Sequence, residues 1–193
     1  MKRIATCCFT GHRPEKLNVP IEIVLEKLEK AIEDAFSDGF TDYITGMSRG
    51  VDIWAAEKVL DMKKEFPHIR LICAIPFNGF EKEWEQGWQD RYQRILQQAD
   101  EIHYICNRYI RWVHQKRKAW MIDHASMVIA CYTGVAGGTQ HSELSELIVK
   151  KYFSAVSTSF LLVFAPFFVL LKKIVKWSSY KYILSTNTLI SIL

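Results

Sequence analysis

Three short glycine-containing segments of this chain combine residue types that could bind a phosphate group. The first, 10–14, reads Thr-Gly-His-Arg-Pro, the second, 45–52, reads Thr-Gly-Met-Ser-Arg-Gly-Val-Asp, and the third, 134–139, reads Gly-Val-Ala-Gly-Gly-Thr. Glycine lets the backbone approach a ligand closely, and an arginine guanidinium binds phosphate or carboxylate with two parallel hydrogen bonds. We therefore expect ligand contacts from Thr10, Gly11, His12, Arg13, Gly46, Met47, Ser48, Arg49, Gly50, Asp52, Gly137, Gly138 and Thr139.

The second and third segments each precede a predicted helix, where unpaired backbone N–H groups and the positive end of the helix dipole favour an anion. Asp52, near the start of its helix, could either cap backbone N–H groups or accept a hydrogen bond from a ribose hydroxyl. Consecutive glycines followed by Thr139 suit a turn that cradles a phosphate, although the third segment is neither a Walker A loop nor a Gly-x-Gly-x-x-Gly motif. Each segment alone is also a common turn, so the prediction depends on their agreement.

The elements that must position these segments are β-rich runs that alternate with helical stretches. Strands are predicted over 4–9, 42–45, 70–75, 101–106 and 127–132, and helices over 20–37, 51–66, 80–95, 109–124 and about 142–151. This alternation predicts βαβ units in a Rossmann-like three-layer α/β sandwich with a mainly parallel sheet. Each glycine segment follows a strand, at the edge where such sheets bind ligands.

The net charge of +4 is unevenly distributed, because residues 151–193 contain five lysines and no Asp, Glu or Arg. Residues 1–150 are thus nearly neutral, and overall charge gives no argument for a nucleic-acid partner. The five cysteines show no C-x-x-C pair or metal-ligand spacing, so we expect buried thiols in a reducing compartment. We discern no Ser-His-Asp or metal-site pattern and assign no catalytic residue and no metal. In the absence of a secretory signal we expect a cytoplasmic protein.

The segment 151–193 differs in composition from the predicted domain over 1–150. Within it, 152–171 is a run of twenty residues without a charge, flanked by lysines, about long enough to cross a hydrocarbon core of about 30 Å. It could be a membrane anchor, spanning or interfacial, or a buried terminal strand or helix of the domain. A third interpretation is a frame-altered sequence, because from Ser154 onward the tail lacks Gly, Asp, Glu, Gln and Arg.

Five stretches of the chain carry a more specific signal through their order and spacing: Cys8–Pro14, Gly46–Asp52, Ala74–Phe77, Trp120–Asp123 and Gly137–Thr139. Together they resemble the YpsA-like family over about residues 1–140. That family belongs to the SLOG superfamily of Rossmann-like proteins, with the Lonely Guy phosphoribohydrolases and the DNA-processing protein A. The resemblance implies a Rossmann-like fold that binds or senses a nucleotide or nucleotide derivative, and NAD and ADP-ribose are candidate ligands.

The chain departs from these families after Thr139. Lonely Guy enzymes carry a PGGxGTxxE motif whose glutamate takes part in cleaving an N-glycosidic bond, and here Glu143 falls one residue late. YpsA-like chains also continue into a helix and a last strand, where this chain enters the apolar tail. We therefore expect a nucleotide-binding protein and leave open whether it catalyses a reaction. The enzyme alternative is a nucleoside-phosphate N-glycosidic hydrolase that uses His12, Asp52 or Glu143.

A third function, single-stranded nucleic-acid binding, would depend on the basic helix predicted over 109–124. There Trp112 and Trp120 interleave with Arg117, Lys118 and other cations, and bases could stack and pair on them. We expect this helix to present a solvated basic face instead. The partner we expect is a small nucleotide-type ligand and not a nucleic acid, and a homo-oligomer remains open.

Overall fold

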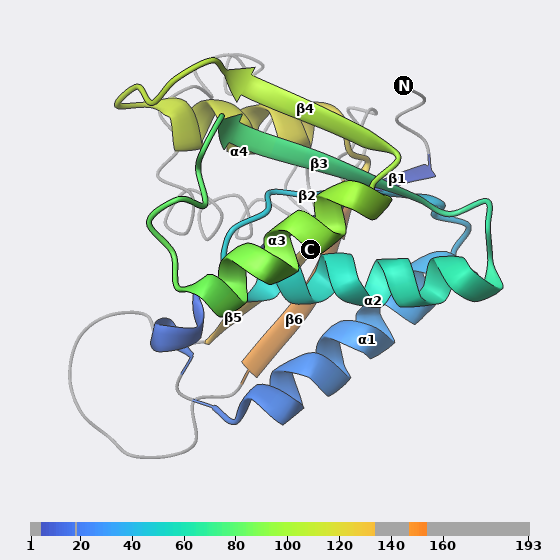
Figure 1. Cartoon of the computed structure of the whole chain (residues 1–193). Helices are drawn as coiled ribbons and strands as arrows, with labels where there is room; N and C mark the ends of the chain where they lie inside the picture. The colour runs from blue at the N-terminus through green and yellow to red at the C-terminus, as the bar shows by residue number, and fades with distance from the viewer. Residues whose placement is uncertain (1–4, 18, 134–146, 154–193) are drawn as a thin grey trace, which may run out of the picture. The chain divides into compact units, whose positions relative to one another are not determined.

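The computed structural model describes residues 5–17 and 19–133, and the backbone of 147–153 (Figure 1). The chain divides into two units, Met1–Ser154 and Ala155–Leu193, and the second unit lies outside the described residues. All described helices and strands belong to the first unit, which is an α/β domain.

The domain is built on a six-stranded sheet in the order β4-β3-β2-β1-β5-β6. The strands are β1 (Thr6–Gly11), β2 (Asp42–Thr45), β3 (Arg70–Phe77), β4 (Glu101–Cys106), β5 (Met127–Thr133) and β6 (Leu147–Phe153). The first five are parallel, which confirms the mainly parallel sheet, and β6 runs antiparallel to β5. Because β1, β2 and β5 end at the same edge, the first two glycine segments leave the sheet there, and the third follows the end of β5 in the sequence.

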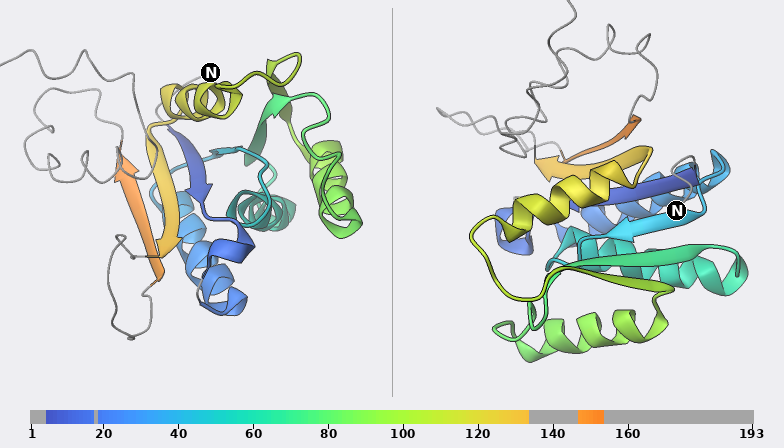
Figure 2. Two further views of the ribbon diagram at one scale, coloured as in Figure 1. Left: turned by 90° about the vertical axis from the view of Figure 1, so that its left-hand side faces the viewer. Right: turned by 90° about the horizontal axis from the view of Figure 1, so that it is seen from above.

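Helices cover both faces of this sheet. In the described part of the chain they are α1 (Ile21–Ser37), α2 (Val51–Glu65), α3 (Gln86–Gln98), α4 (Val113–Asp123) and the short 3₁₀ helix η2 (Pro14–Lys16). The first three βαβ connections move in one direction along the sheet, and right-handed crossovers place α1, α2 and α3 on one face. The connection from β4 returns past β1 to β5, so α4 lies on the other face (Figure 2). The topological switch point is therefore between the carboxyl ends of β1 and β5.

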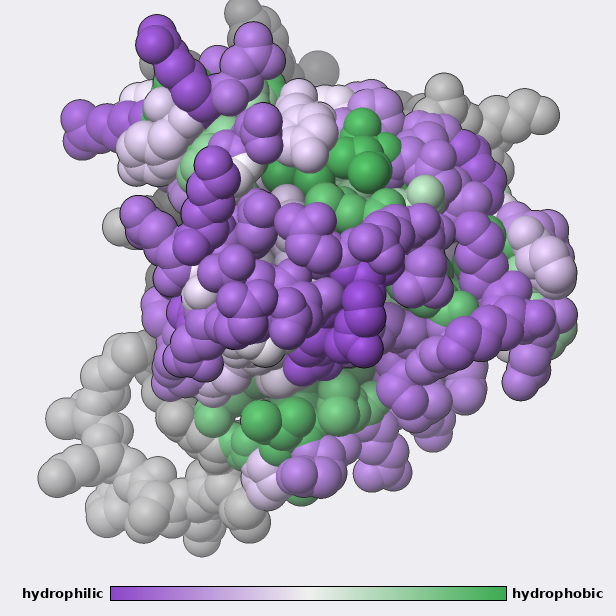
Figure 3. Space-filling model, viewed as in Figure 1, coloured by the Kyte–Doolittle hydropathy of each residue, from purple (hydrophilic) through white to green (hydrophobic). Residues whose placement is uncertain are grey.

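An apolar core on each face holds the layers together. On α1 the residues Val24, Leu28 and Ile32 recur at helical spacing and enter the larger core under α1, α2 and α3. On the other face Met121 of α4 packs against residues of the central strands, among them Ile44. β3 is buried over six consecutive residues because both of its faces are covered. The outer surface of the α1–α3 layer is mostly hydrophilic (Figure 3).

Two helices begin later than the sequence predicts. α3 begins at Gln86 rather than residue 80, so Phe80 and Trp84 lie in turns, each closed by a backbone hydrogen bond spanning three residues. Their rings still pack on the larger core, and Trp84 meets Tyr92 of α3 edge-on with ring centroids 5.5 Å apart. The four-residue spacing therefore predicted burial correctly and backbone conformation incorrectly. α4 similarly begins at Val113 rather than residue 109.

The strand β6 replaces part of a predicted helix. The sequence predicts a helix over about 142–151, of which 142–146 lie outside the described residues and 147–151 belong to β6. All seven residues of β6 pair with β5, from Met127↔Phe153 to Thr133↔Leu147. The Leu-Ile-Val run at 147–149 suits a strand, and the pairing satisfies backbone groups of β5 that would otherwise form an open edge. The domain thus has a last strand where the sequence predicted a departure into the tail.

The described residues include no helix long and apolar enough to span a membrane. Of the predicted anchor, only Tyr152 and Phe153 are described, and they belong to β6. The three interpretations of 154–171 concern residues outside the described range and remain predictions.

All five cysteines are thiols, as expected from the sequence, and Cys7, Cys8, Cys73 and Cys131 are buried as expected, whereas Cys106 is half-buried. Burial raises the pKa of Cys8, Cys73 and Cys131 to about 12. The thiolate is the reactive form of cysteine, so these side chains are inert near neutral pH.

We expect a thiol-alkylating reagent to label the native chain at Cys106 and to label all five cysteines only after unfolding. The reason is steric and electrostatic, since the other four side chains are out of contact with solvent. Peptide mass spectrometry of protein labelled with and without urea measures the difference. Native labelling at Cys8 or Cys73 at the rate of Cys106 would contradict the burial described above.

Candidate functional site

The first and second glycine segments pack against each other at the carboxyl edge of the sheet. A Cβ atom on Gly11 would lie 2.5 Å from the Cβ atom of Val51, the first residue of α2. A Cβ atom on Gly50 would lie 2.8 Å from the carbonyl oxygen of His12. Both distances are too short for a side chain, so glycine at these two positions allows the segments to touch.

Hydrogen bonds and a buried side chain within the second segment determine the path of its backbone. The Thr45 hydroxyl donates to the Asp52 carbonyl oxygen at 2.8 Å and accepts from the Met47 N–H at 3.2 Å. Met47 has a φ of 57° and a fully buried side chain, so it anchors the loop in the core. Gly50 has a φ of 89°, a conformation that glycine adopts far more readily than other residues. These residues fix the path of the loop from β2 to α2.

Asp52 caps this loop. Its Oδ2 accepts a hydrogen bond from the Ser48 N–H at 3.2 Å, and a Cβ atom on Gly46 would lie 2.8 Å from the same oxygen. The residue is 7% exposed. Burial raises the pKa of Asp52, and the charge of Arg117 and the hydrogen bond from Ser48 oppose that rise. Of the two roles predicted for Asp52, capping is the one seen in the structure.

Arg117 of α4 is a site residue that the sequence analysis did not assign. It is 6% exposed, and its Nη1 donates to the carbonyl oxygen of Gly46 and to the hydroxyl of Ser48, the latter at 3.0 Å. The expectation of a solvated face is therefore wrong for this residue. A signal was present, because Val113, Arg117 and Met121 are four residues apart and are the buried residues of α4.

Three cations, Arg13, Arg117 and Lys118, lie near enough to His114 for their charges to act on it, and we call them the cation cluster. Its members act on one side chain, since after burial the charges of Arg117, Arg13 and Lys118 all lower the pKa of His114. Burial and the charge of Arg117 also lower the pKa of Lys118. The charge of Asp52 favours the protonated forms of Arg117 and Lys118 and so raises their pKa values, yet burial lowers both pKa values by more. The cluster is thus rich in positive charge and suits an anion.

Two other predicted residues connect the first segment to its surroundings. Arg49 forms an ion pair with Glu15 of η2 at 2.7 Å, so its guanidinium holds the two segments together. The His12 N–H donates to the Cys131 carbonyl oxygen at 3.3 Å and ties the first segment to β5. Burial, and then the charge of Lys16, lower the pKa of His12, so its imidazole is protonated less readily than a solvent-exposed one.

The strand that precedes the third glycine segment pairs with the start of the first segment. Thr10 and Gly11 pair directly with β5, and the third segment follows the end of β5 at Thr133. No group of three or more His, Cys, Asp or Glu side chains that could hold a metal ion occurs in the described part of the chain. Four predicted residues fall outside that part: Gly137, Gly138, Thr139 and Glu143.

A family model described as the YspA SLOG family matches residues 7–161. The chain belongs to the YpsA family of SLOG proteins. The match confirms the resemblance carried by the glycine segments. It also extends beyond residue 140, so the YpsA-type sequence includes β6 and ends at residue 161, within the tail.

Individual relatives agree with membership of the YpsA family. A UPF0398 protein of Brevibacillus brevis is 28% identical over 156 residues, which cover 78% of this chain and 82% of the relative. A UPF0398 protein of Staphylococcus epidermidis is 32% identical over 114 residues, covering 58% of this chain and 55% of the relative. The prophage-derived protein YoqJ of Bacillus subtilis is 33% identical over 111 residues, covering 51% and 65%. None of these names states a ligand, so the ligand has to be argued from the site.

Proposed function

We propose that this chain binds a nucleotide or nucleotide derivative, such as NAD or ADP-ribose, through a phosphate group. The observation that carries the proposal is the cation cluster at the carboxyl edge of the sheet, near the switch point where α/β sheets bind ligands. A buried charge lowers stability unless it is compensated, and the buried Arg117 has Asp52 close by, whereas the half-buried Lys118 and the exposed Arg13 add two further positive charges beside that one acid. A phosphate would supply the missing negative charge.

Two further features support a phosphate at this place. The Nε atom of Arg117 is buried and has no hydrogen-bond partner among the described residues. A buried donor left without an acceptor lowers stability by about 1–3 kcal/mol, so an acceptor oxygen from a ligand would be stabilising here. The N-terminus of α2 begins at Val51 beside the same loop and adds the positive end of its dipole.

The test is to titrate the full-length chain with AMP, ADP-ribose, NAD and inorganic phosphate, following the melting temperature and the heat of binding. We expect at least one phosphate-bearing ligand to raise the melting temperature. Lys118→Met should then lower the affinity for that ligand about tenfold to a hundredfold, the effect of removing one hydrogen bond to a charged group. Lys116→Met is the matched control, because Lys116 lies two residues earlier on α4 and is exposed.

The proposal fails if none of the four ligands shifts the melting temperature of a chain that unfolds cooperatively. It also fails if Lys118→Met and Lys116→Met weaken binding equally. In that case the loss would follow from overall charge and not from a site at the cation cluster.

A further inference from the structure

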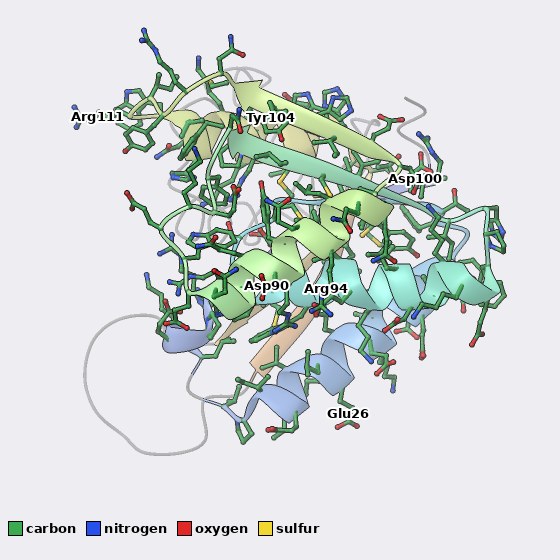
Figure 4. All side chains as sticks on the ribbon, in the orientation of Figure 1. Glu26, Asp90, Arg94, Asp100, Tyr104 and Arg111 are labelled. Atoms are coloured by element: carbon green, nitrogen blue, oxygen red, sulfur yellow. The ribbon has the colours of Figure 1, made fainter. Side chains whose placement is uncertain are left out.

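Aromatic rings gather at the carboxyl ends of β3 and β4, beside the cation cluster. Phe77 ends β3 and Phe80 follows it, while Tyr109 follows β4 and His114 lies in the first turn of α4. Ring centroids are 5.6 Å apart for Phe77–Phe80 and for Phe77–Tyr109, and 5.7 Å apart for Phe80–His114. The neighbouring Arg111 lies beyond the arrowheads of β3 and β4 (Figure 4), which places this loop at the ligand edge of the sheet. We call these four residues the aromatic cluster.

The aromatic cluster and the cation cluster are contiguous. The guanidinium carbon of Arg117 lies 5.7 Å from the centroid of the Phe80 ring. His114 lies between the two clusters. Its ring centroid is 5.7 Å from that of Phe80 and 6.5 Å from that of Tyr109, and the charges of Arg117 and Arg13 lower its pKa. A ligand held by its phosphate at the cations therefore has aromatic side chains next to it.

Core packing accounts for only part of this cluster. Phe80 packs against the larger core, but Tyr109 is 62% exposed. An aromatic ring left so open stabilises the fold little through burial. It does offer a flat surface on which a planar base can stack, because every base has a π-face.

We propose that Tyr109 and His114 stack the base of a nucleotide whose phosphate lies at the cation cluster. The inference rests on the proposed function and narrows it: the ligand class is a nucleotide with an aromatic base, in preference to a sugar phosphate that lacks one. The buried face of α4 would recognise the phosphate through Arg117, and the first turn of α4 with the loop before it would recognise the base.

The experiment compares AMP with ribose 5-phosphate on the full-length chain. We expect Tyr109→Ala to lower the affinity for AMP about fivefold to a hundredfold, the range for removing one aromatic stacking partner, and to leave the affinity for ribose 5-phosphate unchanged. Tyr109→Phe keeps the ring and should keep AMP affinity. Tyr104→Ala is the matched control, because Tyr104 is a 50% exposed tyrosine within β4, and Figure 4 shows it apart from Arg111 of the loop that carries Tyr109.

Each other outcome overturns the inference in a distinguishable way. If Tyr109→Ala leaves AMP affinity unchanged or weakens both ligands equally, the stacking subsite is wrong, while a selective loss in Lys118→Met would keep the proposed function. If Tyr109→Phe lowers AMP affinity as much as Tyr109→Ala does, the Tyr109 hydroxyl and not its ring contacts the ligand. If neither ligand binds the folded chain, the stacking inference fails, and the proposed function then depends on the titrations with ADP-ribose, NAD and inorganic phosphate. Melting temperatures without ligand show that each variant is folded.

Discussion

Replacing Arg117 by methionine is expected to lower the free energy of unfolding by about 3–5 kcal/mol, the range for leaving a buried charge without the opposite charge that compensates it. Methionine is unbranched and fills much of the same volume, so the loss reports on the guanidinium. The Gly46 carbonyl and the Ser48 hydroxyl lose their donor. Asp52 loses the cation that most strongly favours its charged form. Urea unfolding of variant and wild type, followed by circular dichroism, measures the difference.

The double variant Asp52→Asn with Arg117→Met separates charge from packing. Removing both charges should recover part of the loss, because no buried charge then stays without its partner. Lys116→Met is the control for removing a cation from α4, and at this exposed position we expect a change within about 0.5 kcal/mol. An Arg117→Met variant as stable as Lys116→Met would show that Arg117 does not hold the second glycine segment.

The Arg117 variant should also depend on pH. Burial raises the pKa of Asp52 in the folded state, so its contribution to stability is present below the unfolded-state pKa and is lost as pH rises through the folded-state pKa. Without Arg117 that pKa rises further. The stability difference from wild type should therefore shrink as pH is lowered from about 7 towards 4. A difference that grows in acid would contradict the role given to Asp52.

The outline of the site follows from local sequence, because each glycine segment directly follows a strand and parallel strands end at one edge. The partner of the second segment does not follow in this way. Arg117 lies 71 residues after Gly46, and their contact depends on α4 crossing to the other face of the sheet. The charge of Arg117 predicted a solvent-exposed side chain, but its four-residue spacing from Val113 and Met121 indicated the buried face of α4. For an arginine within an apolar stripe, its position on the helix therefore predicted burial better than its charge did.

The sequence predicted secondary structure wrongly where one spacing of apolar residues is compatible with two backbone conformations. Phe80, Trp84 and Trp88 recur every four residues, which suits a helix, but the first two reach the same core from turns. The sequence over about 142–151 predicts an amphipathic helix, yet residues 147–151 belong to a strand, because β5 offers an unpaired edge that a strand can complete. Such pairing joins distant segments, so it is not visible in local periodicity.

Replacing Gly50 by alanine is expected to lower the free energy of unfolding by about 2–5 kcal/mol, from backbone strain and overpacking together. At its φ of 89° a Cβ atom would lie 2.8 Å from the His12 carbonyl oxygen and 2.9 Å from Cδ of Pro14. Neither atom can rotate away, since one belongs to the backbone and the other to a proline ring. The first glycine segment would have to move, and Arg13 with it, so AMP affinity should also fall. Urea unfolding and AMP titration measure the two effects.

Gly39→Ala is the matched control for this substitution. Gly39 has the same φ of 89°, but no atom lies within 4 Å of its added Cβ, so only backbone strain of about 1–2 kcal/mol is expected. Because Gly50 also has a ψ of −128°, outside the left-handed α region, the difference between the two variants measures the contact between the first and second glycine segments together with added backbone strain at Gly50. If Gly50→Ala is no more destabilising than Gly39→Ala and keeps its AMP affinity, that contact does not position Arg13. A selective loss at Gly50 would instead show that the phosphate site depends on two loops held together, because Arg13 reaches the cation cluster only while the first segment stays packed on α2.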